Sequence, residues 1–202
     1  MVEPPPTTGS RRTSSSVATT CPTLNAVASG PEGGPPPAIK PVPVATTFMS
    51  VGPGPARGPG DFYEQPLSVV LDVGGSSGGA VRTFPAVIGV GNHTNATVRI
   101  VWPVTLTVEV TTDVGTVLWA GIFPPITQPL PAQGGWTTDW NWVSKNLAGQ
   151  AIPPGDYTMS IVTPVSITYC LGDKEATETI EPWSGNAMIG EDVSQEIQIP
   201  GQ

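Results

Sequence analysis

The sequence predicts an all-β protein in which two antiparallel sheets pack face to face, preceded by a long extended arm. Two observations carry this prediction. From residue 66 onward, apolar residues recur at every second position in short runs, and helical spacing is confined to the short stretch SKNLAGQ. Before residue 61 the chain holds 13 of its 25 prolines and one aromatic residue, Phe48. The fold class is therefore a β-sandwich behind a Pro/Gly-rich N-terminal segment.

The first 61 residues read as an arm because they lack the apolar content of a core. The stretches VEPPPTTGS, GPEGGPPPAIKPVPV and VGPGPARGPG are dominated by proline and glycine. A segment of this kind buries too little apolar surface to offset its ordering entropy, so it does not fold alone. We divide the chain into an extended Pro/Gly/Ser-rich arm, residues 1–61, and a folded body, residues 62–202. We expect the body to fold without the arm.

Short strand-like runs follow one another along the body, separated by Gly, Pro, Asn and Asp. The run VTLTVEV at 104–110 alternates valine and leucine with threonine and glutamate, which is typical of a strand with one buried face. So many short strands in a body of this size are most simply arranged as two packed sheets. The predicted strands occupy residues 67–73, 84–90, 97–102, 104–110, 116–123, 136–142, 157–162, 165–170, 176–180 and 193–199.

The run WTTDWNW at 136–142 raises the question of whether its tryptophans form a ligand platform or part of the core. Successive strand residues point to opposite faces, so the tryptophans share one face, while Thr137, Asp139 and Asn141 share the other. One aromatic face and one polar face are what a sandwich requires of a strand packed on one side. We therefore expect Trp140 and Trp142 to belong to the core.

Four consecutive stretches of the body share a further order of turns and aromatic positions: GNHTNATVRIVW, VTLTVEVTTDVGTVLWAG, ITQPLPAQGGWTTDWNW and GQAIPPGDYTMSI. This order, over about residues 87–162, resembles the immunoglobulin-like β-sandwich of the BsuPI-type intracellular proteinase inhibitors. The resemblance implies an immunoglobulin-like antiparallel sandwich, in which Trp119 fills the centre and Tyr157 anchors its hydroxyl at a strand corner. It leaves the function open, because folds of this kind host many functions.

The charge of the chain limits its partners. The net charge is −8, and the first 60 residues contribute four basic and two acidic side chains, or +2, so the remainder carries −10. An acidic body repels phosphate backbones and anionic lipid headgroups, so we expect neither nucleic acid nor membrane as a partner. The sequence has no run of about 18 apolar residues and no charged-then-apolar export signal at its start.

The two cysteines lie far apart in the sequence, Cys21 in the arm and Cys170 in the body. They could be free thiols, a bridge that pins the arm, or an intermolecular link. The sequence shows no export signal that would indicate an oxidising compartment, so we expect free thiols.

No arrangement in the sequence points to catalysis, a cofactor or a metal. The only histidine, His93, lies in a turn, where we expect it to be exposed and inert. Carboxylates in turns usually accept hydrogen bonds from nearby backbone amides rather than bind calcium. We expect this role for Asp113, Asp156, Asp173 and Glu175. Asn92 and Asn95 match the N-glycosylation pattern, and we interpret both as turn asparagines.

The arm favours a structural role in a large assembly over a free binding module. At 3.1 Å per residue, a polyproline-like segment of this length reaches up to about 190 Å, which suits contact with several subunits. It also contains spaced apolar residues that a partner could bury. We expect a non-enzymatic virion protein, a capsid decoration or cement protein like those of tailed bacteriophages, attached by its arm to the major capsid protein at the virion surface. The alternative is a free proteinase-inhibitor-like or cell-surface domain, extracellular or on a cell surface, and a homo-oligomer is left open. The expected partner-binding residues are Val17, Leu24, Val27, Val42, Val44, Phe48 and Met49.

Overall fold

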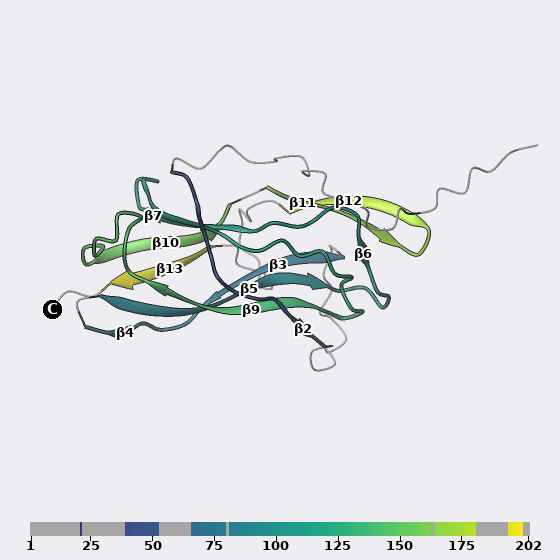
Figure 1. The fold of residues 1–202 in the computed structure, drawn as a ribbon, viewed down its shortest axis with the longest axis horizontal. Coiled ribbons are helices and arrows are strands. Elements are labelled where there is room, and N and C mark those ends of the chain that lie inside the picture. The colour runs from purple at the N-terminus through teal and green to yellow at the C-terminus, as the bar shows by residue number, and fades with distance from the viewer. Residues whose placement is uncertain are drawn as a thin grey trace, which may run out of the picture.

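The computed structural model describes residue 21 and residues 39–52, 66–79, 81–162, 164–180 and 194–199. Within these residues, strands are the only regular secondary structure, and they form three sheets (Figure 1). All strand pairs are antiparallel except one, so the predicted all-β fold class with packed antiparallel sheets is confirmed.

One sheet, called here the β7 sheet, has five strands in the order β1-β8-β7-β10-β13. The strand β1 pairs with β8 in parallel, and the other neighbours pair antiparallel. The strands are β1 (Val42–Pro43), β7 (Thr107–Thr112), β8 (Val117–Ile122), β10 (Gly155–Ile161) and β13 (Ser194–Ile199).

The second sheet, the β5 sheet, has the order β2-β9-β5-β3, and the short strand β4 pairs with β5 beside it. Its longest ladder joins β5 and β9 from Thr83↔Val143 to Asn92↔Gly134. The strands are β2 (Met49–Val51), β3 (Leu67–Val73), β4 (Ser77–Gly78), β5 (Arg82–Asn92) and β9 (Gly134–Val143).

A smaller third sheet, the β11 sheet, lies at one end of the molecule (Figure 1). Its order is β12-β11-β6, with β6 (Arg99–Ile100), β11 (Val165–Leu171) and β12 (Lys174–Ile180). The strands β11 and β12 form a hairpin around the two-residue turn Gly172-Asp173, where the positive φ of Gly172, 62°, favours glycine.

The core lies between the β7 and β5 sheets and follows from the two-residue period of the sequence. Val108, Val110 and Met159 point inward from the β7 sheet, and Ile88 and Val90 point inward from the β5 sheet; all five are fully buried. Their neighbours along each strand point outward, because successive side chains alternate between the faces of a sheet. The alternation of the sequence thus builds both inner faces.

Part of the segment that we assigned to the arm belongs to the sheets. Residues 42–43 form β1 at one edge of the β7 sheet, and residues 49–51 form β2 at one edge of the β5 sheet. Between them the chain crosses from one sheet to the other (Figure 1). We call residues 40–52 the strap. These strand pieces are too short to show a period of two, so the sequence pattern did not reveal them.

Candidate functional site

The strap is held at both ends by backbone pairing and between them by side chains. Val42 pairs with Gly121, and the Val44 amide donates to the Ile122 carbonyl at 2.8 Å. Midway, the hydroxyls of Thr46 and Thr138 form a hydrogen bond. Each edge thus gains a strand, and the residues at the two ends of the strap gain backbone hydrogen-bond partners.

Beneath the strap lies a cluster of aromatic rings that joins the two sheets. Trp119 of β8 stacks on Trp140 of β9, with ring centroids 5.3 Å apart and planes inclined by 21°. Phe123 meets Trp140 edge-on at 5.3 Å, and Trp142 contacts Trp119 at 6.2 Å and Phe84 at 5.5 Å. Offset stacks and edge contacts of this kind add to the apolar burial.

The structure places the four expected core residues at two depths. Trp142 and Tyr157 are buried, whereas Trp119 and Trp140 are half-buried and pack against the core from its side. The Tyr157 hydroxyl donates to the Pro153 carbonyl at 2.8 Å and so ties the turn to the start of β10. Trp136, on the same face of β9, donates its indole N–H to the Pro129 carbonyl at 2.9 Å.

A glycine lets the strap approach the aromatic cluster. A Cβ at Gly121 would lie 2.8 Å from Val44 Cγ2 and would also overlap the ring of Trp119. Contacts this short do not occur in folded proteins, so any larger residue here would push the strap or the indole away. Gly121 therefore sets the close packing of strap against sheet.

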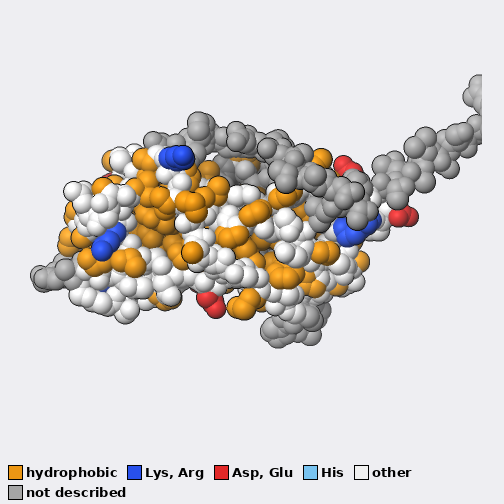
Figure 2. All heavy atoms as spheres, in the orientation of Figure 1, with side chains coloured by type: hydrophobic (Ala, Val, Ile, Leu, Met, Phe, Trp, Pro, Cys, Tyr) orange, Lys and Arg blue, Asp and Glu red, His pale blue; other side chains and the backbone are white. Residues whose placement is uncertain are grey.

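The described part of the arm presents both inward and outward apolar side chains. Val44 and Phe48 pack against the core, whereas Val42 and Met49 are 39% and 59% exposed. Val51 of β2 and Ile122 of β8 are also exposed. We call Val42, Met49, Val51 and Ile122 the strap surface. Apolar side chains gather on the face that the strap crosses, and charged side chains are sparse there (Figure 2).

The other expected contact residues of the arm, Val17, Leu24 and Val27, lie outside the described residues. The structure therefore divides the four described residues into two inward anchors, Val44 and Phe48, and two outward side chains, Val42 and Met49. The sequence distinguished no such roles, because an extended segment without a period does not show which side will meet a sheet.

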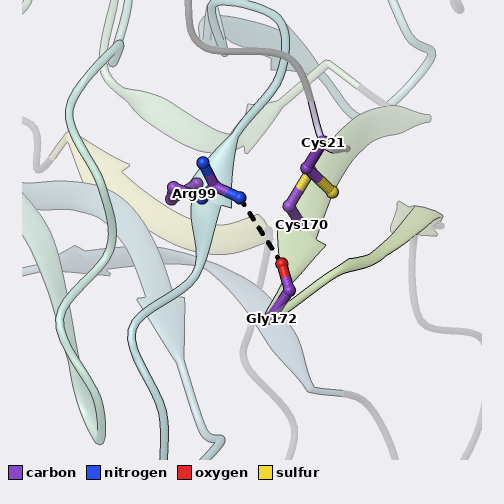
Figure 3. The surroundings of a disulfide bond; sticks show 4 residues. All are labelled: Cys21, Arg99, Cys170 and Gly172. Atoms are coloured by element: carbon purple, nitrogen blue, oxygen red, sulfur yellow. Dashed lines mark hydrogen bonds between the residues drawn. A yellow bond between two sulfur atoms is a disulfide. The ribbon is translucent and has the colours of Figure 1, made fainter. Parts of the chain in front are cut away.

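The two cysteines form a disulfide bond, so the expectation of free thiols is wrong (Figure 3). Their Cα atoms are 6.0 Å apart, and both residues are buried in a small cluster with Val101. Nearby, the Arg99 side chain donates to the Gly172 carbonyl at 3.4 Å. The expectation rested on the lack of an export signal, whereas pairing depends on which residues the fold brings together. The bond ties the arm at residue 21 to β11.

The proline-rich segment that follows β8 is fixed to the body at several points. Ile126 and Leu130 are buried, and they form backbone bridges with Val104 and Val98. The Pro129 carbonyl accepts the Trp136 indole N–H described above. This segment is therefore a packed edge of the sandwich rather than a protruding loop.

Asn92, which we expected in a turn, is the last residue of β5, and its side chain reaches into the turn that follows. Its amide nitrogen donates to the carbonyls of Ala96 and Pro131, each at 2.9 Å, and its oxygen accepts from the amide and hydroxyl of Thr94. The residue is buried. Asn95 is exposed, and its side-chain oxygen accepts from Gln133 at 3.1 Å.

His93 is half-buried and more engaged than expected. Its Nε2 atom lies 2.8 Å from the hydroxyl of Ser68, which is itself buried on β3. Its backbone carbonyl accepts from the Gln133 side chain at 2.6 Å. These bonds hold the β5–β6 turn against the end of the β5 sheet.

The four carboxylates considered for calcium lie at three separate places in the fold. Asp113 is in the β7–β8 turn, Asp156 accepts from Gln198 at 3.2 Å, and Asp173 and Glu175 belong to the β11–β12 hairpin. Among the described residues, no three His, Cys, Asp or Glu side chains are grouped as metal ligands. No helix suited to crossing a membrane is found among them either.

Glu109 is a partly buried carboxylate in the centre of the β7 sheet. It lies opposite the fully buried Ala120, and within the described part of the chain its Oε1 atom has no hydrogen-bond partner. Burial raises the pKa of the Glu109 carboxyl above its ordinary value, because the charged form loses hydration.

Sequence comparisons with family models and curated proteins add no relatives to this description. No protein-family model matches the chain, and no curated protein is similar to it in sequence. Its function is therefore inferred from the fold and the strap surface alone.

Proposed function

We propose that this chain is a non-enzymatic structural protein of a large assembly, a decoration protein of a virion surface that contacts the major capsid protein through its N-terminal segment. The observation that carries the proposal is the strap surface. Met49 is 59% exposed on an edge strand whose neighbour Phe48 packs inward, so the segment is fixed to its own body while it presents apolar side chains outward.

Three features support protein subunits as partners. The body is acidic, which disfavours nucleic acid and anionic membranes. The strap surface lies on a face with few charges (Figure 2), as the centre of a protein interface does. The strap is ordered in advance by β1 and β2, so a partner that binds it does not meet the full entropic cost of ordering it.

A second candidate, a free binding module outside the cell or on a cell surface, is favoured by the disulfide. Disulfides persist in oxidising surroundings, which an extracellular domain and a released virion share. Proteinase inhibition ranks lower, because the segment best suited to enter a protease cleft, residues 122–135, is held down by buried Ile126 and Leu130. The structural role therefore stays first.

The test is co-sedimentation of the full chain with particles that lack it. Met49→Asp places a charge in the strap surface and should weaken binding by at least about tenfold. Val114→Asp is the matched control, because Val114 is 80% exposed in the β7–β8 turn and does not belong to the strap surface. Equal binding by the two variants and the parent chain would overturn the strap surface as the attachment site. Absence of any binding by the parent chain would favour the free binding module.

A further inference from the structure

Among the described residues, β12 forms an unpaired edge of the β11–β12 hairpin. Its ladder runs without a register shift from Leu171↔Lys174 to Val165↔Ile180, and β12 contains no proline. In the part of the chain that the structure describes, no strand pairs with the other edge of β12. Side chains 174–177 and Thr179 are exposed, and Glu178 is half-buried. The strand therefore lacks two common protections of an edge, a bulge and a proline.

The register shows which backbone groups face the open edge. The pair that closes a two-residue hairpin turn, Leu171 and Lys174, is a hydrogen-bonded pair, and bonded and non-bonded pairs alternate along the ladder. Thr168 and Thr177 are thus a non-bonded pair. In agreement, the Thr168 carbonyl accepts from the Val101 amide at 2.8 Å, on the side away from β12. The N–H and C=O groups of Glu175, Thr177 and Thr179 consequently point to the open edge.

The charges along β12 are complementary to a second copy of the same strand in one register. In an antiparallel pair with its two-fold axis at Ala176, Lys174 of each copy lies opposite Glu178 of the other. Glu175 then lies opposite Thr177 in the hydrogen-bonded positions. The small Ala176 side chains meet at the axis, where the two strands come closest.

The adjacent registers are less favourable. An axis at Glu175 sets the two Glu175 carboxylates against each other, and like charges directly opposite are destabilising. An axis at Thr177 sets Lys174 opposite the apolar Ile180, so the Lys174–Glu178 pair between the two copies is lost. Only every second residue of β12 directs its backbone groups to the open edge. The registers closest to the one with its axis at Ala176 are therefore those with the axis at Glu175 or at Thr177.

We propose that β12 pairs antiparallel with β12 of a second copy of this chain, with the two-fold axis at Ala176, so that two β11 sheets become one continuous sheet. Main-chain hydrogen bonds from Glu175 and Thr177 supply affinity, and the two Lys174–Glu178 pairs fix the register. This surface is separate from the strap surface, and the inference does not depend on the proposed function.

Sedimentation velocity of the full chain, without particles, tests the pairing over about a hundredfold range of concentration. The parent chain should form dimers as its concentration rises. Lys174→Glu should raise the dimer Kd by at least about tenfold, because two attractive pairs become repulsive. The double reversal Lys174→Glu with Glu178→Lys should restore the parent Kd to within about threefold. Lys145→Glu, an exposed site with the same change in charge, should leave the Kd unchanged.

Glu178 accepts a hydrogen bond from the Leu67 amide at 3.2 Å, so the double reversal loses this bond and can fold poorly. A second variant keeps the test decisive in that case. Glu175→Pro removes an outward N–H and no hydrogen bond to β11, so it should abolish the dimer while thermal unfolding stays cooperative. The proposal is overturned if the parent chain stays monomeric throughout, if Lys145→Glu and Lys174→Glu weaken the dimer equally, or if a well-folded Glu175→Pro variant still dimerises.

Discussion

Trp119 and Trp140 come from opposite sheets, yet their rings stack with centroids 5.3 Å apart beneath the strap. Trp140 also meets Phe123 edge-on, so it links three elements of the sandwich. Half-buried rings at the side of a core behave as part of it when a neighbouring segment covers them, and here Val44 and Phe48 pack against the same core. Stability of the sandwich and attachment of the strap are therefore coupled.

The first prediction concerns Trp140. Trp140→Ala removes the stack and the edge contact, and we expect a loss of about 3 kcal/mol in the free energy of unfolding, at the lower end for such truncations because the ring is half-buried. Asn141→Ala, on the exposed face of the same strand, should cost under about 0.5 kcal/mol. Urea unfolding measures both. Equal losses would show that the two faces of β9 do not differ as the structure indicates.

The second prediction concerns the disulfide, which spans 149 positions of the sequence. Closing a loop of this length in the unfolded chain stabilises the folded state by about 5 kcal/mol in the chain-entropy model. A reducing agent should therefore lower the midpoint of urea unfolding of the parent chain. The double variant Cys21→Ser, Cys170→Ser should already unfold at the lower midpoint and should not respond to the reductant. A parent chain that ignores the reductant would contradict the stabilising role.

The third prediction separates the strap from the disulfide by truncation. Chains that lack residues 1–38 and residues 1–52 both lose Cys21, but only the second loses the strap. The shorter chain should be less stable by about 2 kcal/mol or more, because Val44 and Phe48 no longer bury apolar surface. Its tryptophan fluorescence should shift to longer wavelength as Trp119 and Trp140 meet water. Identical unfolding and emission of the two chains would mean that the strap adds nothing to the body.

The fourth prediction concerns pH and Glu109. Because the pKa of this carboxyl is raised in the folded state, the folded chain binds the proton more tightly than the unfolded chain does. Glu109 therefore lowers stability as the pH rises from the ordinary glutamate pKa through the raised one. Glu109→Gln should raise the melting temperature at neutral pH and flatten this part of the pH profile. An unchanged profile, measured by thermal unfolding at several pH values, would rule out Glu109 as its source.

The sequence by itself determined which face of each long strand is buried. In β9 the even positions from Trp136 to Trp142 point toward the core and Asp139 and Asn141 point to solvent, as the period of two requires. The resemblance to an immunoglobulin-like sandwich likewise implied that Tyr157 anchors its hydroxyl at a strand corner, and this hydroxyl donates to the Pro153 carbonyl there. These features depend on residues that are neighbours along the chain or along one strand, so local spacing is enough to predict them.

Only the tertiary structure decided the pairing of Cys21 with Cys170 and the two roles of the strap residues. A disulfide depends on which Cα atoms come within about 7 Å, and no spacing in the sequence reports that distance. The strands β1 and β2 are two and three residues long, too short for a period, and they are strands only because β8 and β9 leave open edges beside them. Phe48 faces the core and Met49 faces solvent for the same reason: the edge that a short segment joins, rather than its own composition, sets which side is buried.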